Sequence, residues 1–306
     1  MNSKFSLKTI FITFAAFNFN IMQLYSFITE RWMSDGGAVF GVVPKAIWGR
    51  FCPSDERNNV PTCIRCLLVD TGEKIILFDT GMGSKQNEKF YSYRFIYGDE
   101  SLDTAFKNIG YRFEDVTDII FTHLHYDHVG GAFRRKKDEQ TAVPVFPNAR
   151  YWCSARQWQW ATHPNVREAA SFLPENQNPL IESGKLHFIE EEGYFTKNIY
   201  LRMFHGHTDG QIIPIIESDG KTFAFVADFI PTVFHLPLPY ITAYDTRPLL
   251  SMEEKEQFLN EAYTKNYYLI FEHDPVTECC SLSKTEKGIQ ADKKFTLKET
   301  MKKEIK

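Results

Sequence analysis

Residues 121–131 read Phe121-Thr122-His123-Leu124-His125-Tyr126-Asp127-His128-Val129-Gly130-Gly131, directly after an apolar run that predicts a short buried strand. Three imidazoles and one carboxylate fall within six residues of this stretch. Imidazole nitrogens and carboxylate oxygens are preferred ligands of zinc and related ions. Ionisable groups this close together would otherwise repel one another or need separate partners. The stretch therefore predicts part of a metal site rather than a histidine-rich polar loop.

The chain has 306 residues and a hydrophobic share of 43%, which is enough for a sizeable core, and no shift in composition divides it. We therefore expect one domain over residues 23–306, preceded by an extension over residues 1–22. The balance of 35 basic and 39 acidic residues gives a net charge of −4. This charge disfavours nucleic acid as a partner and leaves a small molecule as the expected one.

The extension carries an apolar stretch behind Lys4 and Lys8, as in a signal peptide, but no small-x-small cleavage site follows it. The stretch is short for a membrane span and is interrupted by Asn18 and Asn20, so no stable membrane insertion is expected. The interpretations, in order of preference, are a segment without a role in the fold, a secretion signal and a membrane anchor. We expect a cytoplasmic protein, or a periplasmic or secreted one if the segment is a signal peptide.

Six cysteines are present without the density of a disulfide-stapled scaffold, so they are expected to be buried thiols. Cys63 and Cys66 form a C-x-x-C pair inside a predicted strand. A three-residue offset directs these two side chains to opposite faces of a strand. The pair is therefore not expected to bind metal or to act in redox chemistry.

Alternating apolar residues predict a hairpin over residues 62–70 and 74–80, with Asp79 at its end, and a second hairpin over residues 211–217 and 221–228 that ends in Asp228. The chain thus resembles two related halves. A strand is also expected over residues 36–43, a helix over residues 251–264, and a frayed helix at the C-terminus. Asp79 is expected to support a histidine ligand, because an unpaired buried carboxylate is costly.

Ligand-type residues recur just beyond the ends of predicted strands: His123, His125, Asp127, His128, His207, Asp228 and His273. Seven such residues are enough for two metal ions. The order Thr-His-x-His-x-Asp-His, a later Gly-His-Thr, an aspartate that ends a strand and a final histidine resembles the metallo-β-lactamase superfamily of hydrolases, over residues 36–281. The resemblance implies an α/β fold, a four-layer αββα sandwich with a dinuclear site at one edge.

The resemblance also implies a role for each ligand. One ion, with zinc expected, would be held by His123, His125 and His207, a second by Asp127, His128 and His273, and Asp228 would bridge both. Asp127 and Asp228 are thereby the expected catalytic carboxylates. A bridging hydroxide would be the nucleophile, since a metal ion lowers the pKa of bound water to about 7. His207 is preferred to His205 because it matches the Gly-His-Thr element.

Within the superfamily, the sequence most resembles the N-acyl homoserine lactone lactonases, which are quorum-quenching enzymes. Many β-lactamases of this fold carry a cysteine where this chain has Asp228. The resemblance implies hydrolysis of a lactone with an apolar acyl part. The alternatives are another ester, a thioester, a phosphotriester or a β-lactam as substrate, or a metal-binding protein without hydrolytic activity.

One position departs from the lactonase pattern. The familiar lactonases have a tyrosine three residues after the bridging aspartate, where this chain has Pro231. Tyr240 and Tyr244 are the expected catalytic replacements, ahead of His235. The aromatic-rich segments 83–97 and 229–247 are expected to form the walls that select the substrate, although the aromatic residues of 83–97 could equally anchor that loop on the core.

Overall fold

The structure is a computed structural model that describes residues 22–135 and 142–301. The interpretations of the N-terminal extension concern residues 1–21, which lie outside this part of the chain. Within the described residues, no helix has both the length and the apolar character needed to cross a membrane.

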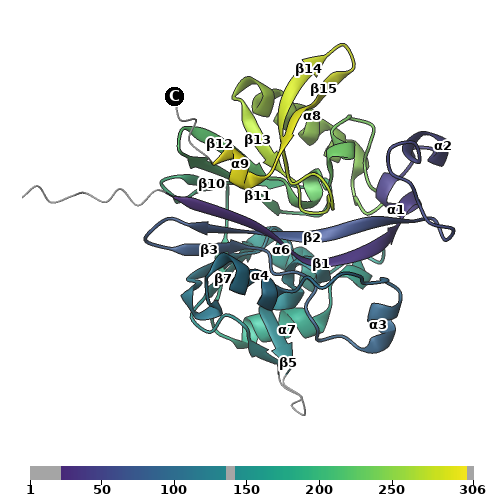
Figure 1. Cartoon of the computed structure of the whole chain (residues 1–306). Helices are drawn as coiled ribbons and strands as arrows, with labels where there is room; N and C mark the ends of the chain where they lie inside the picture. The colour runs from purple at the N-terminus through teal and green to yellow at the C-terminus, as the bar shows by residue number, and fades with distance from the viewer. Residues whose placement is uncertain (1–21, 136–141, 302–306) are drawn as a thin grey trace, which may run out of the picture.

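Two β-sheets pack face to face in the middle of the molecule (Figure 1). The first sheet has six strands, in the hydrogen-bonded order β1 (Gln23–Asp35), β2 (Asn59–Asp70), β3 (Ile75–Phe78), β4 (Asp118–Ile120), β7 (Arg150–Ser154) and β8 (Leu186–Ile189). The second has seven, in the order β15 (Gly288–Phe295), β14 (Cys279–Thr285), β13 (Tyr267–Ile270), β12 (Lys221–Phe225), β11 (Gln211–Ser218), β10 (Ile199–Phe204) and β9 (Gly193–Thr196). A small ribbon is formed by β5 (Phe133–Arg135) and β6 (Ala142–Pro144).

Helices cover the outer faces of both sheets. Those on the first sheet include α4 (Leu102–Ile109), α6 (Ala155–Thr162) and α7 (Pro174–Glu182), whereas α8 (Pro248–Thr264) packs on the second (Figure 1). The shorter helices are α1 (Gly36–Phe40), α2 (Lys45–Trp48), α3 (Glu88–Ser92), α5 (Tyr126–Val129) and α9 (Leu297–Thr300). This order of layers confirms the αββα sandwich expected from the sequence.

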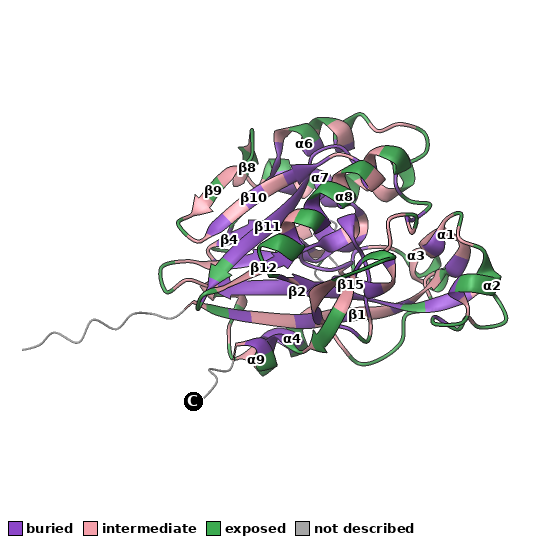
Figure 2. Ribbon diagram, turned by 90° about the horizontal axis from the view of Figure 1, so that it is seen from above, coloured by how far each residue is buried: buried purple, intermediate pink, exposed green. Residues whose placement is uncertain are grey.

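The molecule has one hydrophobic core between the two sheets and another between the first sheet and its helices. Alternate side chains of β2 point into one core or the other. Leu67 and Val69 face the second sheet, while Cys66 and Leu68 face the helices on the other side. Cys63 Sγ contacts the backbone oxygen of Glu272, so the two thiols of the C-x-x-C pair lie on opposite faces, as predicted. Figure 2 shows β2, β11 and β12 as largely buried, which is typical of the central strands of a sandwich.

The two halves of the chain repeat one strand arrangement. In the first half, β2 and β3 pair antiparallel and β3 then pairs parallel with β4. In the second half, β11 and β12 pair antiparallel and β12 pairs parallel with β13. Parallel neighbours end at the same edge of a sheet, so the residues that follow β3, β4, β12 and β13 meet at one edge of the sandwich.

Two local predictions were wrong. Residues 36–40 form helix α1, and residues 41–43 a turn, rather than a strand, because the Asp35 carboxylate accepts a hydrogen bond from the Ala38 backbone at 2.8 Å and caps the helix. Helix α8 begins at Pro248, three residues before Ser251, since proline suits the first position of a helix. Near the C-terminus, the short helix α9 agrees with the expected terminal helix, and the residues before it form the hairpin β14–β15, which extends the second sheet.

Candidate metal centre

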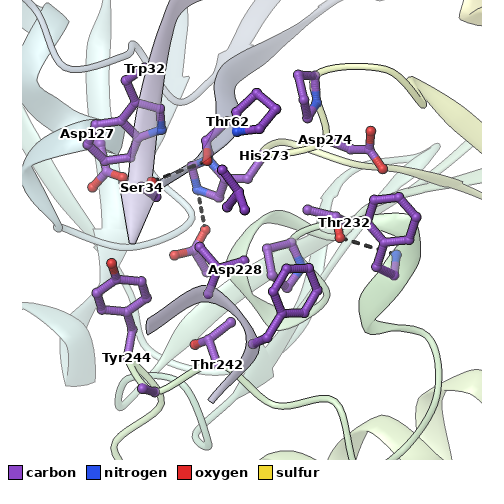
Figure 3. Close-up of a pocket in the computed structure, with 18 of the residues that line it drawn as sticks. Trp32, Ser34, Thr62, Asp127, Asp228, Thr232, Thr242, Tyr244, His273 and Asp274 are labelled. Atoms are coloured by element: carbon purple, nitrogen blue, oxygen red, sulfur yellow. Dashed lines mark hydrogen bonds and ion pairs between the residues drawn. The ribbon is translucent and has the colours of Figure 1, made fainter. Parts of the chain in front are cut away.

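The predicted ligands meet where four strands end. His123 and His125 follow β4, His207 follows β10, Asp228 lies in a short 3-10 turn (Ala227–Phe229) after β12, and His273 follows β13. Figure 3 shows the Asp228 carboxylate facing the His273 ring, with Asp127 nearby. Side chains that are distant in sequence are therefore brought together by the parallel ends of the strands.

The first group contains three buried histidines. His125 Nδ1 lies 2.9 Å from His123 Nε2 and 3.3 Å from His207 Nε2. With an oxygen of Asp228, one ligand atom from each residue lies within 4.8 Å of the others. This is the group expected to hold the first ion.

The second group contains Asp127, His128 and His273, whose ligand atoms also lie within 4.8 Å of one another. All three side chains are buried. His128 Nε2 lies 3.9 Å from Asp127 Oδ2. The residues expected to hold a second ion are thus adjacent to the first group.

The Asp228 carboxylate lies between the two groups. Its Oδ2 is 3.3 Å from His207 Nε2 and 3.8 Å from His123 Nε2. Its Oδ1 is 2.6 Å from His273 Nε2 and 3.3 Å from His128 Nε2. One oxygen therefore faces each group, which is the arrangement that a bridging carboxylate requires.

Each imidazole ring has an inner nitrogen, which faces the other candidate ligands, and an outer nitrogen, which faces away from them. In four of the histidines the outer nitrogen lies next to a hydrogen-bond acceptor. The pairs are His125 Nε2 with Glu168 Oε1 at 2.8 Å, His207 Nδ1 with Asp245 Oδ1 at 3.1 Å, His128 Nδ1 with Asp79 Oδ2 at 3.0 Å, and His273 Nδ1 with the Cys63 carbonyl oxygen at 2.8 Å. Because carboxylates and carbonyls only accept hydrogen bonds, the ring proton belongs on the outer nitrogen. Asp79 contacts His128 as predicted.

The inner nitrogens then carry lone pairs that point at one another and at Asp228. Neutral rings in this tautomer cannot satisfy one another by hydrogen bonds. His128 Nε2 is indeed buried without a hydrogen-bond partner, which is costly in the absence of a cation. Burial also lowers the pKa of His123 well below its ordinary value, which favours the neutral ligand form. The side chains present therefore fit divalent cations.

Three supporting carboxylates were not identified from the sequence. Glu168 precedes a 3-10 turn (Ala169–Ser171) and follows no recognisable motif, and Asp245 was grouped only with the expected wall loop. Glu272 precedes His273 and lies 3.2 Å from His128 Nδ1. Burial raises the pKa of Glu272 to about 8. Burial also acts to raise the pKa of Glu168, but hydrogen bonds from His125, Thr208 and Trp160, together with the charge of His125, outweigh it and lower this pKa to about 2.

A cavity of about 410 Å³ opens above the ligands (Figure 3). Its polar end contains His125, Asp127, His207, Asp228 and His273. Its apolar wall comes from α1, the loop after α2, the start of β2 and the segment 229–247, and includes Val39, Phe40, Phe51, Cys52, Val60 and Phe234. This division suits a ligand with one polar end and one apolar end.

The two predicted walls have different outcomes. Segment 229–247 lines the cavity as expected, through residues such as Thr232, Phe234 and Tyr244. Residues 83–97, all of which are described, do not line it, and Phe90 and Tyr91 pack on the core cluster around Trp32. The alternative interpretation of that loop, an anchor on the core, holds for Phe90 and Tyr91, because their rings contact buried apolar side chains, whereas Tyr93, Phe95 and Tyr97 are exposed.

The two candidate tyrosines occupy different places. Tyr244 lines the cavity, and its hydroxyl points toward the carboxylates of Asp127 and Asp228 (Figure 3). Desolvation and the charge of these carboxylates raise the pKa of Tyr244 to about 12, so its hydroxyl keeps its proton at neutral pH. Tyr240 packs against Phe51 and does not line the cavity.

The family model described as metallo-beta-lactamase superfamily matches residues 64–273. This range includes all seven candidate ligands and more than two thirds of the chain. The chain therefore belongs to the metallo-β-lactamase superfamily, as the sequence motif predicted.

Two kinds of relatives resemble the chain more specifically. An N-acyl homoserine lactonase of Bacillus cereus is 37% identical over 153 residues, which cover 42% of this chain and 60% of that protein. The chain thus matches less than two thirds of that relative. A probable metal-dependent hydrolase from Staphylococcus aureus superimposes with a TM-score of 0.80 at 25% identity, covering 90% of this chain and 98% of the other. These names agree with the expected class, a metal-dependent hydrolase.

A further solved structure shares the fold. The dizinc quorum-quenching lactonase AidC, in complex with the product N-hexanoyl-L-homoserine, superimposes with a TM-score of 0.74 at 22% identity. The superposition covers 90% of this chain and 95% of that one. It supports the αββα architecture over nearly the whole described chain.

Proposed function

We propose that the protein is a dinuclear metal-dependent hydrolase that opens the ring of a lactone of the N-acyl homoserine lactone type. The observation that carries the proposal is the position of Asp228, whose two oxygens face two separate groups of histidines. The names of the relatives favour this substrate over a β-lactam. In such a reaction water adds to the ester carbonyl, the ring C–O bond breaks, and a hydroxy acid is released.

The chain would hold the two ions through the seven ligands already described, with zinc the expected metal. When bound, the ions supply a hydroxide nucleophile near neutral pH and a Lewis acid for the carbonyl. The protein contributes orientation, because Glu168, Asp245, Asp79 and the Cys63 carbonyl fix four of the imidazole rings. The protonated Tyr244 hydroxyl is placed to donate a hydrogen bond to a substrate oxygen.

The cavity supports an acyl substrate. Its polar end would receive the lactone ring, and its apolar wall would contact the acyl chain of the substrate. Because each buried methylene group stabilises binding by about 0.8 kcal/mol, a wall of this kind favours a long acyl chain. The same division disfavours a substrate that is charged at both ends.

The test is a comparison of specificity constants. The zinc-loaded full chain is assayed on N-acyl homoserine lactones, aryl esters, a glutathione thioester, a phosphotriester and a β-lactam, with Asp228→Ala as the control for contaminating activity. We expect the highest kcat/KM on the lactones and at least a hundredfold loss in the control, on the order of the loss when a catalytic group is removed. A higher kcat/KM on any other class would overturn the lactone proposal and assign that class.

A further inference from the structure

Lys255 is a buried cation that the proposed reaction does not use. It lies on α8, 1% exposed, on the side of segment 229–247 away from the cavity. Its Nζ donates hydrogen bonds to the backbone oxygens of His235 at 2.9 Å, Pro237 at 3.1 Å and Tyr240 at 3.0 Å. The structure shows no ion pair for this ammonium in the described part of the chain, and Asp245 acts on it only through its charge at longer range.

This arrangement ties the conformation of the segment to one side chain. A lysine ammonium has three protons, and here three carbonyls of a single loop accept all of them. Burying a charge is costly unless it is fully hydrogen-bonded, so the cost of Lys255 is offset only when residues 235–240 hold this conformation. The segment contains Pro231, Pro237 and Pro239, which lack N–H groups, so its backbone bonds come from other residues, among them Ala243 N–H, which donates to the Ala38 carbonyl oxygen of α1 at 2.8 Å. Lys255 adds bonds to three carbonyls of residues 235–240.

His235 extends the connection to the wall of the cavity. Its Nε2 donates to the Val39 carbonyl oxygen at 2.8 Å, and its Nδ1 accepts from the Thr232 hydroxyl at 2.8 Å. The ring stacks on Phe40 with centroids 5.4 Å apart and planes 7° apart. Val39, Phe40 and Thr232 all line the cavity, so the chain of contacts runs from α8 through the loop to the apolar wall.

We propose that Lys255 and His235 are positioning residues that hold helix α1 and segment 229–247 together and so determine the length of acyl chain the cavity accepts. The proposal rests on the proposed function, because it assumes that the apolar wall receives the acyl part of the substrate. Neither residue touches the metal ligands, so their loss would alter substrate choice before it altered metal binding.

The test uses binding as well as turnover. The zinc-loaded full chain binds the fluorescent apolar probe N-phenyl-1-naphthylamine, and hexanamide, octanamide and decanamide then displace it. The variants are Lys255→Met and His235→Phe. The second variant keeps an aromatic ring against Phe40, and neither variant introduces a buried charge. The matched control is Lys265→Met, an exposed lysine at the end of the same helix.

In the wild type, each added methylene should improve displacement by about fourfold until the wall is fully contacted. In both variants we expect the preference for decanamide over hexanamide to fall by at least about threefold, with KM for the lactone raised, kcat nearly kept and zinc content unchanged. The control should match the wild type. If Lys255→Met does not fold, His235→Phe alone decides.

An unchanged chain-length preference in the folded variants would overturn the proposal, and so would a wild type that does not bind the probe. Displacement requires no turnover. Therefore a failure to hydrolyse lactones would count against the proposed function alone and would leave the role of Lys255 and His235 to be judged from binding.

Discussion

Glu168 Oε1 accepts a hydrogen bond from His125 Nε2 at 2.8 Å and thereby turns the opposite nitrogen of the ring toward His123 and His207. The same carboxylate accepts from Trp160 Nε1 at 2.5 Å and from Asn165 Nδ2 at 3.2 Å. A carboxylate that accepts three hydrogen bonds is itself held in place, so it fixes the orientation of the imidazole ring that it contacts. The geometry of the first histidine group therefore depends on a residue far from the His-rich motif.

Replacing Glu168 by Gln should weaken zinc binding by about 10- to 100-fold, the usual loss when a partner that orients a ligand is removed. The amide loses the negative charge that favours a proton on the outer nitrogen of His125. Competition with a chromophoric chelator measures the affinity. Glu175→Gln, at an exposed position on α7, serves as the control. Equal affinity in the Glu168 variant and the wild type would show that His125 needs no such support.

Replacing Tyr244 by Phe should lower kcat by about tenfold, which corresponds to one lost hydrogen bond of about 1.4 kcal/mol. Metal content should stay the same, because the hydroxyl is not among the candidate ligands. Steady-state kinetics on the best lactone measure the effect. Tyr240→Phe is the matched comparison and should resemble the wild type, since Tyr240 does not line the cavity. A larger loss in the Tyr240 variant would reverse the assignment.

The stability of the wild type should decline between about pH 6.5 and pH 4 partly through His235. Burial, aided by the charge of Lys255, lowers the pKa of His235 to about 4 from its ordinary value of 6.5. The unfolded state thus binds more protons in this window, so the free energy of unfolding falls as the pH falls, by up to about 3 kcal/mol from this residue.

Urea unfolding at pH 7 and pH 4.5 checks this contribution, on wild type and His235→Gln that have both been stripped of metal. The variant lacks the titrating ring, so its loss of stability between the two pH values should be smaller. Equal losses in the two proteins would mean that His235 is protonated without cost in the folded state.

Gly130→Ala should destabilise the protein, because a Cβ atom at this position would lie 1.9 Å from the Met82 carbonyl oxygen. Backbone on both sides has to move, and overpacking of this kind costs about 1–3 kcal/mol. The urea midpoint measures the loss. Gly193→Ala, where nothing lies within 4 Å, should change stability by less than about 0.5 kcal/mol. Similar midpoints for both variants would show that the close approach is easily relieved.

The sequence predicted the features that follow from local pattern. Hairpin alternation located β2, β3, β11 and β12, and strand ends located the residues from His123 to His273 that the structure brings together. The two glycines after the motif, Gly130 and Gly131, lie against carbonyl oxygens of the loop after β3. Asp79 and Asp228, the aspartates near the ends of the two hairpins, were expected at the site, and both reach it.

What the sequence missed depends on contacts between distant segments. Glu168 supports His125 from a turn with no motif, and Lys255 reaches three carbonyls that local pattern cannot connect with it. Helix α1 was predicted as a strand because its small apolar residues suit either structure, and the Asp35 cap decides between them. One of the two predicted cavity walls was therefore misplaced. The sequence assigned it to residues 83–97, whereas α1 and the loop after α2 form that part of the wall.

The central claim is that two groups of ligands, joined by Asp228, hold two ions. Elemental analysis of the full chain, saturated with zinc and freed of loosely bound metal by gel filtration, tests this most directly. The proposal predicts two zinc ions per chain, and about one or fewer in Asp228→Ala because the bridge is lost. A wild-type value of one or fewer would contradict the dinuclear centre.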